Sequence, residues 1–268
     1  MNRFRNAVVS SPKHFHSPMR ALILSDIHAN IDALEAVLAA APPYDTVWNL
    51  GDIVGYGAAP NEVVERVRAL GGIFVRGNHD RACSGTRTYD DFSSMAGRAA
   101  KWTRSVLTEE NAAWLRSFAK GPVATESALV TCVHGSMRDE DEYVISIRDA
   151  WLAMKDSTSQ ITFFGHTHLQ GGFAANQDEW QNVVPLFPAE EGLQEAAIAI
   201  EPNRRYLLNP GSVGQPRDRD PRAAFAIYDE DAQQVIFYRI DYDIRLAQMR
   251  ILRAHLPERL AQRLNEGR

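Results

Sequence analysis

Short apolar runs alternate with helix-like segments over the first third of the chain. Residues 20–25 and 46–50 are continuous apolar runs, which are typical of strands buried on both faces. Residues 31–41 and 60–70 instead carry their apolar side chains on one face of a helix. A third short strand pattern follows over 73–75. The order strand, helix, strand, helix, strand predicts a parallel α/β sheet.

The rest of the chain is first helical and then rich in strands. Residues 81–120 have a mostly helical composition, and further helices are predicted over 147–154 and over 242–264, with an interruption near Pro257. Residues 175–195 lack a clear period, so we expect a long hairpin or loop there. The pattern predicts strands over 128–133, 160–164, 171–174, 196–200, 206–209, 223–228 and 235–240. It therefore indicates a mainly parallel sheet early in the chain and antiparallel strands late.

Composition excludes several classes of protein. Apolar residues make up 45% of the 268 residues and charged residues 24%, as in ordinary globular proteins. The formal net charge is −5, so we expect no extended nucleic-acid surface. No apolar run approaches the ~18 residues that a membrane span needs. The two cysteines, Cys83 and Cys132, cannot form a disulfide framework, which favours a cytoplasmic location.

The first nineteen residues differ from the rest. They are rich in Ser, Pro, His and basic residues, and their one apolar cluster, residues 7–9, is too short for a secretory signal. We expect residues 1–19 to be a disordered extension, or a mis-assigned start with Met19 as the initiator. Residues 20–268 show no linker and no composition break, which predicts a single domain.

Polar side chains follow five of the predicted strands. In open α/β sheets, ligand sites lie beyond the carboxyl ends of the strands. Imidazole and carboxylate groups without a thiolate suit Mn²⁺, Fe or Zn²⁺. A site for two metal ions also needs a carboxylate that bridges ions ~3.5–4 Å apart, and Asp52, directly after a glycine, is placed for that role. The side chains brought to this edge are those of Asp26, His28, Asp52, Asn78, His79, His134, His166 and His168.

The short sequence blocks that contain these polar residues together resemble the motifs of the calcineurin-like metallophosphoesterase superfamily. A further segment, Asn-Pro-Gly-Ser-Val-Gly over 209–214, is similar to the bacterial small-phosphodiesterase branch of it. Each short motif is unspecific by itself, and the complete ordered set carries the resemblance. The blocks are Asp26-Ile27-His28, Gly51-Asp52, Gly77-Asn78-His79-Asp80, His134 and Gly165-His166-Thr167-His168.

The resemblance implies a fold and a metal centre. The implied fold is a four-layer α-β-β-α sandwich of two mixed β-sheets flanked by helices. The implied cofactors are two divalent transition-metal ions (Mn, Fe or Zn), with Mn or Fe favoured. Asp52 would bridge the two ions. Asp26, His28 and His168 would hold the first ion, and Asn78, His134 and His166 would hold the second.

The resemblance also implies a reaction. A metal-bridging hydroxide would attack a phosphate ester in line, because a divalent ion lowers the pKa of bound water toward ~7. His79 would be the catalytic residue that stabilises the transition state or protonates the leaving oxygen. Asp80 is expected to orient His79 from behind.

Three further residues are candidates for substrate binding, each with a structural alternative. Arg76 either binds the substrate phosphate or braces its own loop. Tyr56 either lines the pocket or belongs to a glycine-rich turn. Arg217 either clamps a phosphate or is a surface arginine among neighbouring charges. The arginines of 245–263 are expected on a solvated helix face.

The substrate stays open at this point. Small phosphodiesters or nucleotides are favoured, and the alternatives are a phosphomonoester or phosphoprotein phosphatase and a dinucleoside polyphosphate hydrolase. A catalytically silent scaffold of the same fold is the non-enzyme alternative, but such a scaffold should have lost ligands.

Residues 81–120 are expected to form a helical cap-like insert that shapes substrate choice. A leucine stripe formed by Leu256, Leu260 and Leu264 packs either on the core or on a second copy of the chain, so a homo-oligomer is considered.

Overall fold

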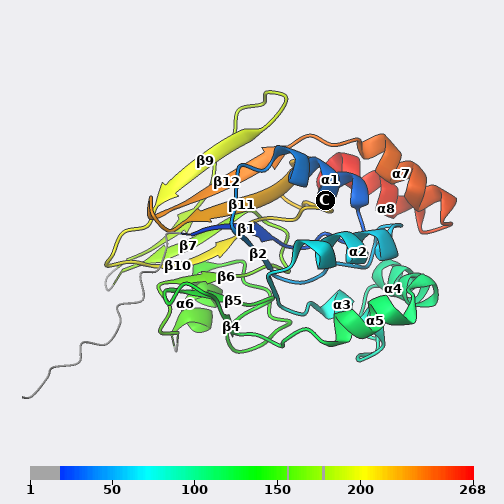
Figure 1. Ribbon diagram of the computed structural model, residues 1–268, viewed down its shortest axis with the longest axis horizontal. Coiled ribbons are helices and arrows are strands. Elements are labelled where there is room, and N and C mark those ends of the chain that lie inside the picture. The colour runs from blue at the N-terminus through cyan, green and yellow to red at the C-terminus, as the bar shows by residue number, and fades with distance from the viewer. Residues whose placement is uncertain (1–18, 156, 177–178) are drawn as a thin grey trace, which may run out of the picture.

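The computed structural model describes residues 19–155, 157–176 and 179–268, and the strands in these residues form two mixed six-stranded sheets (Figure 1). They are β1 (Arg20–Leu24), β2 (Thr46–Asn49), β3 (Ile73–Phe74), β4 (Val123–Ala124), β5 (Val130–Cys132), β6 (Ile161–Phe163), β7 (Gly171–Ala175), β8 (Trp180–Val183), β9 (Gln194–Ala199), β10 (Arg205–Asn209), β11 (Ala223–Asp229) and β12 (Gln234–Ile240). The first sheet has the order β3-β2-β1-β11-β12-β9, and the second has the order β4-β5-β6-β10-β7-β8. In the first sheet, β1 pairs in parallel with β2 and antiparallel with β11.

Helices cover the outer faces of both sheets. Those formed by the described residues are α1 (Ile31–Ala40), α2 (Pro60–Leu70), α3 (Asn78–Ser84), α4 (Ser94–Val106), α5 (Glu109–Arg116), α6 (Ile147–Met154), α7 (Ile244–Arg253) and α8 (Glu258–Glu266). In Figure 1, α1 lies against the first sheet, where it contacts β11 and β12, and α6 lies outside the second sheet, where it contacts β8. The predicted four-layer α-β-β-α sandwich is therefore confirmed.

The alternation of side chains along β1 explains the layers. Successive residues of a strand point to opposite faces. Leu22 and Leu24 pack into the apolar layer under α1, whereas Ile23 packs between the sheets with Trp48 and Phe163. Each of these side chains is fully buried, and burial of one large apolar side chain stabilises the fold by ~1.5–3 kcal/mol.

Most of the predicted elements are present. The helix over 147–154 has the predicted bounds, and the early parallel and late antiparallel strands are confirmed. Residues 175–195 contain the hairpin partner β8, which pairs antiparallel with β7, followed by an irregular stretch before β9. The two-residue strand β4 was not predicted, since two residues show no period. The sequence pattern also did not predict that β10 pairs in parallel with β6.

The structure bears on two predictions from the sequence, one for the N-terminal segment and one for the leucine stripe. The extension expected over residues 1–19 lies outside the described residues except for Met19, which is buried. Leu256, Leu260 and Leu264 are buried in an apolar cluster that contains residues of α7 and α8, so this stripe packs on the chain itself. Among the helices in the described part of the chain, none is long and apolar enough to cross a membrane.

Main-chain hydrogen bonds hold the loops after the strands together. The N–H of Asp26 donates to the carbonyl of Gly51 (3.0 Å), and the N–H of His28 donates to the carbonyl of Asp52 (3.0 Å). In the second sheet, the N–H of Gly165 donates to the carbonyl of His134 (2.8 Å). The polar side chains that follow different strands are therefore fixed to one another at a shared edge.

Candidate metal centre

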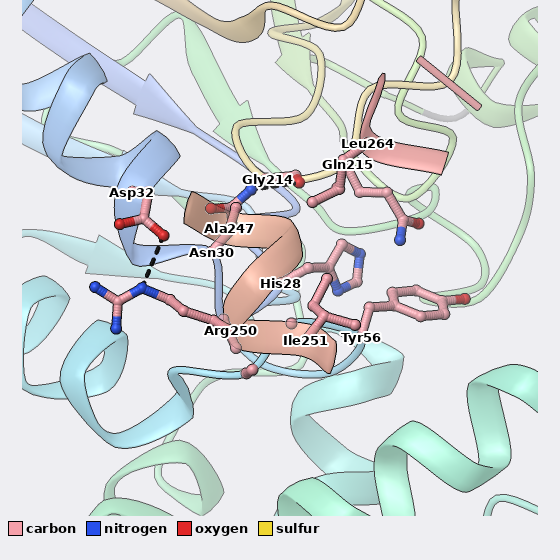
Figure 2. A pocket seen from close by; sticks show the side chains of 13 residues that line it. His28, Asn30, Asp32, Tyr56, Gly214, Gln215, Ala247, Arg250, Ile251 and Leu264 are labelled. Carbon is pink, nitrogen blue, oxygen red and sulfur yellow. Dashed lines mark hydrogen bonds and ion pairs between the residues drawn. The ribbon is translucent and has the colours of Figure 1, made fainter. Parts of the chain in front are cut away.

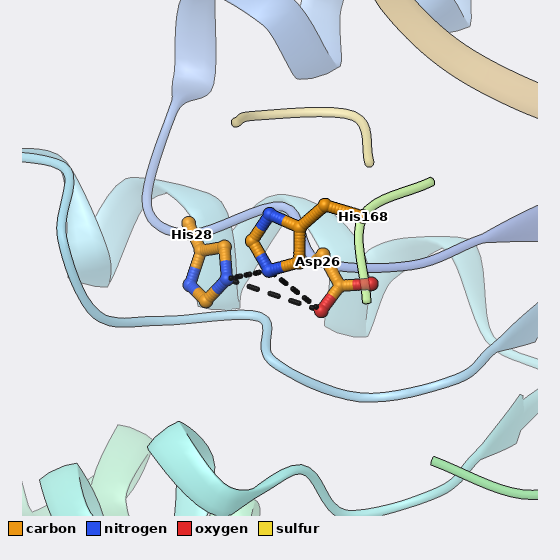
Figure 3. A group of neighbouring side chains, drawn as sticks. All are labelled: Asp26, His28 and His168. Atoms are coloured by element: carbon orange, nitrogen blue, oxygen red, sulfur yellow. Dashed lines mark hydrogen bonds and ion pairs between the residues drawn. The ribbon is translucent and has the colours of Figure 1, made fainter. Parts of the chain in front are cut away.

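Two groups of three ligand-type side chains lie at this edge. Within each group, the possible ligand atoms all lie within 4.8 Å of one another, and every member is buried. Each group joins side chains from loops distant in the sequence. In the first group, drawn in Figure 3, Asp26 and His28 follow β1 and His168 follows β6. The first group is Asp26, His28 and His168, and the second is Asp52, His134 and His166.

Asp52, a member of the second group, also lies next to the first group. Its Oδ2 atom is 3.7 Å from Nε2 of His28 in the first group and 3.5 Å from Nε2 of His134 in the second. Asn78 lies beside the second group, with its Oδ1 atom 3.3 Å from Nε2 of His134. The arrangement could therefore hold two cations that share the Asp52 carboxylate, with the amide oxygen of Asn78 as a further ligand.

Three of the histidines have a fixed tautomer. Each bonds a main-chain carbonyl through Nδ1, and because a carbonyl only accepts, Nδ1 carries the proton. These bonds join His28 to Val54 (3.1 Å), His134 to Leu50 (2.8 Å) and His168 to Gln215 (2.6 Å). When these rings are neutral, their Nε2 lone pairs consequently face the centre, which is the orientation that a metal ligand needs. The Nε2 atoms of His28 and His168 are 3.1 Å apart, so a cation that both ligate would relieve their repulsion.

The carboxylate of Asp26 has one unsatisfied oxygen. Its Oδ2 accepts hydrogen bonds from the hydroxyl of Ser25 (2.6 Å) and the N–H of His166 (3.1 Å). Its Oδ1 is buried without a hydrogen bond and lies 3.3 Å from Nε2 of His168. Buried polar atoms are normally paired, so this oxygen fits a metal ligand. Burial, with the nearby charge of Asp52, raises the pKa of Asp26 to about 7.

The electrostatics of the site also fit cations. Burial lowers the pKa of His28 and His168 well below the usual value, and that of His166 to about 3, which keeps these rings neutral and able to ligate. His134 behaves differently. Burial lowers its pKa, but the charge of Asp52, a hydrogen bond to the same carboxylate and the charge of Asp26 together outweigh burial and raise the pKa to about 9. The buried carboxylates thus attract positive charge into the centre.

The backbone is strained at five of the seven predicted ligands. A positive φ is uncommon for residues with a side chain, and each such position costs ~1–3 kcal/mol. Such strain persists where surrounding contacts over-determine it, and it clusters at functional sites. The five φ angles are 52° at Asp26, 49° at His28, 55° at Asp52, 66° at His166 and 60° at His168.

Asp80 does not bond the ring of His79, contrary to expectation. Its carboxylate instead accepts four main-chain N–H groups, those of Asp52 (2.8 Å), Ile53 (2.8 Å), Val54 (3.2 Å) and Gly77 (3.0 Å). The reason is geometric: Asp80 lies on the first turn of α3 and faces the loop after β2. Asp80 therefore positions the Asp52 loop.

His79 lies between this loop and a cavity. Its N–H donates to Oδ1 of Asp52 (2.8 Å), and its ring packs 4.4 Å from the Tyr56 ring and 4.7 Å from the Phe92 ring, centroid to centroid. Its Nδ1 is buried without a hydrogen bond. A Cβ at Gly55 would lie 2.4 Å from that nitrogen, so the glycine leaves room for the ring. Burial lowers the pKa of His79 to about 4.

The three predicted substrate-binding residues have different surroundings. Tyr56 and Arg217 line a cavity of about 380 Å³ together with Asn78, His79 and His166. Arg76 does not line this cavity, and its guanidinium forms two hydrogen bonds to Glu140 (2.7 and 2.8 Å). The structural alternative for Arg76, bracing its own loop, fits this contact better. Sequence reasoning missed the cavity residues Phe92, Tyr143 and Arg263, because none belongs to a recognisable motif.

Comparison with known proteins agrees with this geometry. A model of the calcineurin-like phosphoesterase superfamily domain matches residues 19–233. An uncharacterized protein of Methanocaldococcus jannaschii is 34% identical over 255 residues, which cover 92% of this chain and 97% of that protein. The crystal structure of a metallophosphoesterase from Sphaerobacter thermophilus is similar, with 42% identity, a TM-score of 0.80 and coverage of 94% of this chain and 100% of that one.

Two further similarities are weaker, the first because the sequence identity is low and the second because the aligned segment is short. A hypothetical protein of Pyrococcus horikoshii shares the fold, with a TM-score of 0.73 at 21% identity over 93% of this chain and 98% of that one. A symmetrical bis(5'-nucleosyl)-tetraphosphatase of Yersinia enterocolitica is 40% identical over 67 residues, which are 23% of each chain.

The four-layer sandwich and the paired ligand groups are those of a metallophosphoesterase, a hydrolase of phosphate esters. The chain belongs to the calcineurin-like phosphoesterase superfamily. Membership implies divalent metal ions, and the two ligand groups are where such ions fit.

Proposed function

We propose that the chain hydrolyses small phosphodiesters or nucleotides at a centre of two divalent transition-metal ions. The position of the Asp52 carboxylate, near His134 of its own group and near His28 of the other group, carries the proposal, because a shared carboxylate is what brings two ions within reach of one phosphate. In this centre, Asp26, His28 and His168 hold the first ion, and Asn78, His134 and His166 hold the second.

The ligand set favours Mn or Fe. Its donors are imidazoles, carboxylates and one amide oxygen, without a thiolate. When bound, the two ions supply a nucleophilic water at neutral pH and offset charge on the phosphoryl oxygens. His79 faces the same space from the cavity wall, where it stabilises the transition state or protonates the leaving oxygen.

The cavity suits a small substrate. Its volume of about 380 Å³ lies at the lower end of the range for ligand pockets, ~300–1,000 Å³, and its wall includes the rings of Tyr56, Phe92 and Tyr143. Aromatic walls favour an aryl or nucleobase group on the ester. Cap-like residues of 81–120, among them Phe92, contribute to this wall, which supports their expected influence on substrate choice.

A dinucleoside polyphosphate is the second candidate substrate. The 67-residue similarity to a symmetrical bis(5'-nucleosyl)-tetraphosphatase favours it, although that segment is 23% of each chain. For the cellular location we propose the cytoplasm, since both cysteines are free.

A substrate panel tests the proposal. The protein is loaded with Mn²⁺, and kcat/KM is measured for bis-p-nitrophenyl phosphate, p-nitrophenyl phosphate and diadenosine tetraphosphate. We expect the diester to exceed the monoester by about 10-fold or more, an increment of ~1.4 kcal/mol in transition-state binding. Preference for the monoester contradicts the proposed substrate class, whereas the highest value for the tetraphosphate favours the second candidate. Asp52→Asn serves as the inactive control for all three.

A further inference from the structure

Two arginines line the cavity beside the metal-ligand groups. Arg217 follows β10, and its N–H donates to the carbonyl of His168 (3.2 Å), so it lies directly beside the first ligand group. Arg263 belongs to α8 and lines the same cavity. Both guanidinium carbons lie over the ring of Tyr56, at 5.7 Å for Arg217 and 5.8 Å for Arg263 from its centroid.

These two arginines differ from a third one in the same cavity. Arg87 is ion-paired with Asp91 and with Asp141 (2.6 Å). Within the described residues, Arg217 and Arg263 form no ion pair with an Asp or Glu side chain. Nε of Arg217 is buried without a hydrogen bond, and Nε of Arg263 donates to the main-chain oxygen of Arg268 (2.6 Å). Neither guanidinium group therefore forms a direct ion pair with an Asp or Glu side chain, although the charge of Glu266 acts on Arg263.

The helix that carries Arg263 is held firmly against the centre. Figure 2 shows Leu264 and Ile251 lining the same small pocket as His28 and Tyr56, which is formed by α7, α8 and the loop of Tyr56. Leu264 is buried next to Arg263 in the sequence. The arginine is therefore presented by a packed helix, so its backbone needs no further ordering when the side chain binds a ligand.

The proximity of two unpaired cations is unfavourable by itself. Burial and the positive charge of Arg217 together lower the pKa of Arg263. An anion between the two groups would remove this repulsion, and guanidinium groups bind phosphate through paired hydrogen bonds. The metal-ligand groups already account for the phosphate that reacts, so the arginines are available for a different group.

We propose that Arg217 and Arg263 form a subsite for a second phosphate of the substrate, separate from the phosphate that is hydrolysed. The inference rests on the proposed function and narrows its substrate class to esters that carry a further phosphate, such as nucleoside polyphosphates. In this arrangement the Tyr56 ring lies between the arginines and His79, and it packs against the substrate atoms that connect the two phosphates.

Binding of two non-hydrolysable probes tests the subsite. The Mn²⁺-loaded full chain is titrated calorimetrically with methylphosphonate and with methylenediphosphonate, which adds a second phosphonate. We expect the second probe to bind about 10-fold tighter or more to the unaltered protein, because the added phosphonate would accept charge-assisted hydrogen bonds from the two guanidinium groups. In Arg263→Gln and Arg217→Gln this preference falls to about 3-fold or less, whereas Arg263→Lys retains part of it.

Arg253→Gln is the matched control. Arg253 is exposed on α7, and its replacement removes the same charge from the neighbouring helix. We expect it to keep the full preference. Equal binding of both probes by the unaltered protein, or a preference retained in both Gln variants, overturns the subsite. Circular dichroism checks folding, and Arg263→Gln decides the matter if Arg217→Gln does not fold.

The titration also separates two kinds of failure. It needs no turnover, so a protein that hydrolyses no ester but shows the arginine-dependent preference refutes the proposed function alone. A protein that hydrolyses esters yet shows no such preference refutes the subsite alone.

Discussion

The carboxylate of Asp80 accepts a hydrogen bond from the main-chain N–H of Asp52 (2.8 Å), and so joins the loop after β2 to the first turn of α3. The same carboxylate holds the N–H of Gly77 (3.0 Å), next to Asn78. A residue that ligates nothing therefore fixes the proposed bridging carboxylate and a proposed ligand relative to each other.

Asp80→Asn should weaken both the fold and metal binding. One amide oxygen cannot accept all four N–H groups, and the amide nitrogen then faces donors. We expect the free energy of unfolding to fall by ~2–3 kcal/mol and Mn²⁺ affinity by ~10–100-fold. Urea unfolding and a Mn²⁺ titration measure the two effects. The exposed Asp90→Asn is the control, and unchanged Mn²⁺ affinity in Asp80→Asn would refute the positioning role.

His79→Ala should impair turnover and spare the metals. His79 lies in the cavity wall beside the proposed ligand Asn78, but it belongs to neither ligand group. We expect kcat to fall by ~10²–10⁴-fold with unchanged metal content. Steady-state kinetics and elemental analysis measure these quantities, with the exposed His255→Ala as control. Loss of metal from His79→Ala would show that this residue ligates.

Gly55→Ala tests the placement of the His79 ring. A Cβ at this position would lie 2.4 Å from Nδ1 of His79, so the ring must move. We expect kcat to fall by about 10-fold or more through misplacement of the imidazole, with metal content kept. Gly192→Ala is matched for backbone strain, since φ is 86° there against 93° at Gly55, but nothing lies near its Cβ. Equal losses in both variants would mean that backbone strain alone is responsible.

The sequence predicts most of the elements, and the meeting of the candidate ligands at one edge, for a physical reason. Buried strands and amphipathic helices leave periodic patterns, and the strands deliver their polar ends to one edge. The side-chain partners of those residues could not be predicted from the sequence, because they lie in loops that are distant along the chain. Glu140, the partner of Arg76, lies 64 residues away, and Asp80 bonds a loop 26 to 28 residues earlier.

Arg263 is the clearest example of a residue whose surroundings could not be predicted from the sequence. Its position in an arginine-rich terminal helix is typical of a solvated face, and no motif distinguishes it from Arg259 or Arg253. Only the packing of α8 against the Tyr56 loop brings this one arginine into the cavity. Tertiary packing of this kind leaves no local pattern in the sequence.

Metal stoichiometry tests the central claim most directly. The protein is purified without chelator, supplemented with Mn²⁺, dialysed, and analysed for transition metals per chain. The geometry around Asp52 predicts close to two ions per chain, and about one or fewer in Asp52→Asn, because the shared carboxylate is lost. A protein that binds no transition metal under these conditions contradicts the two-metal centre.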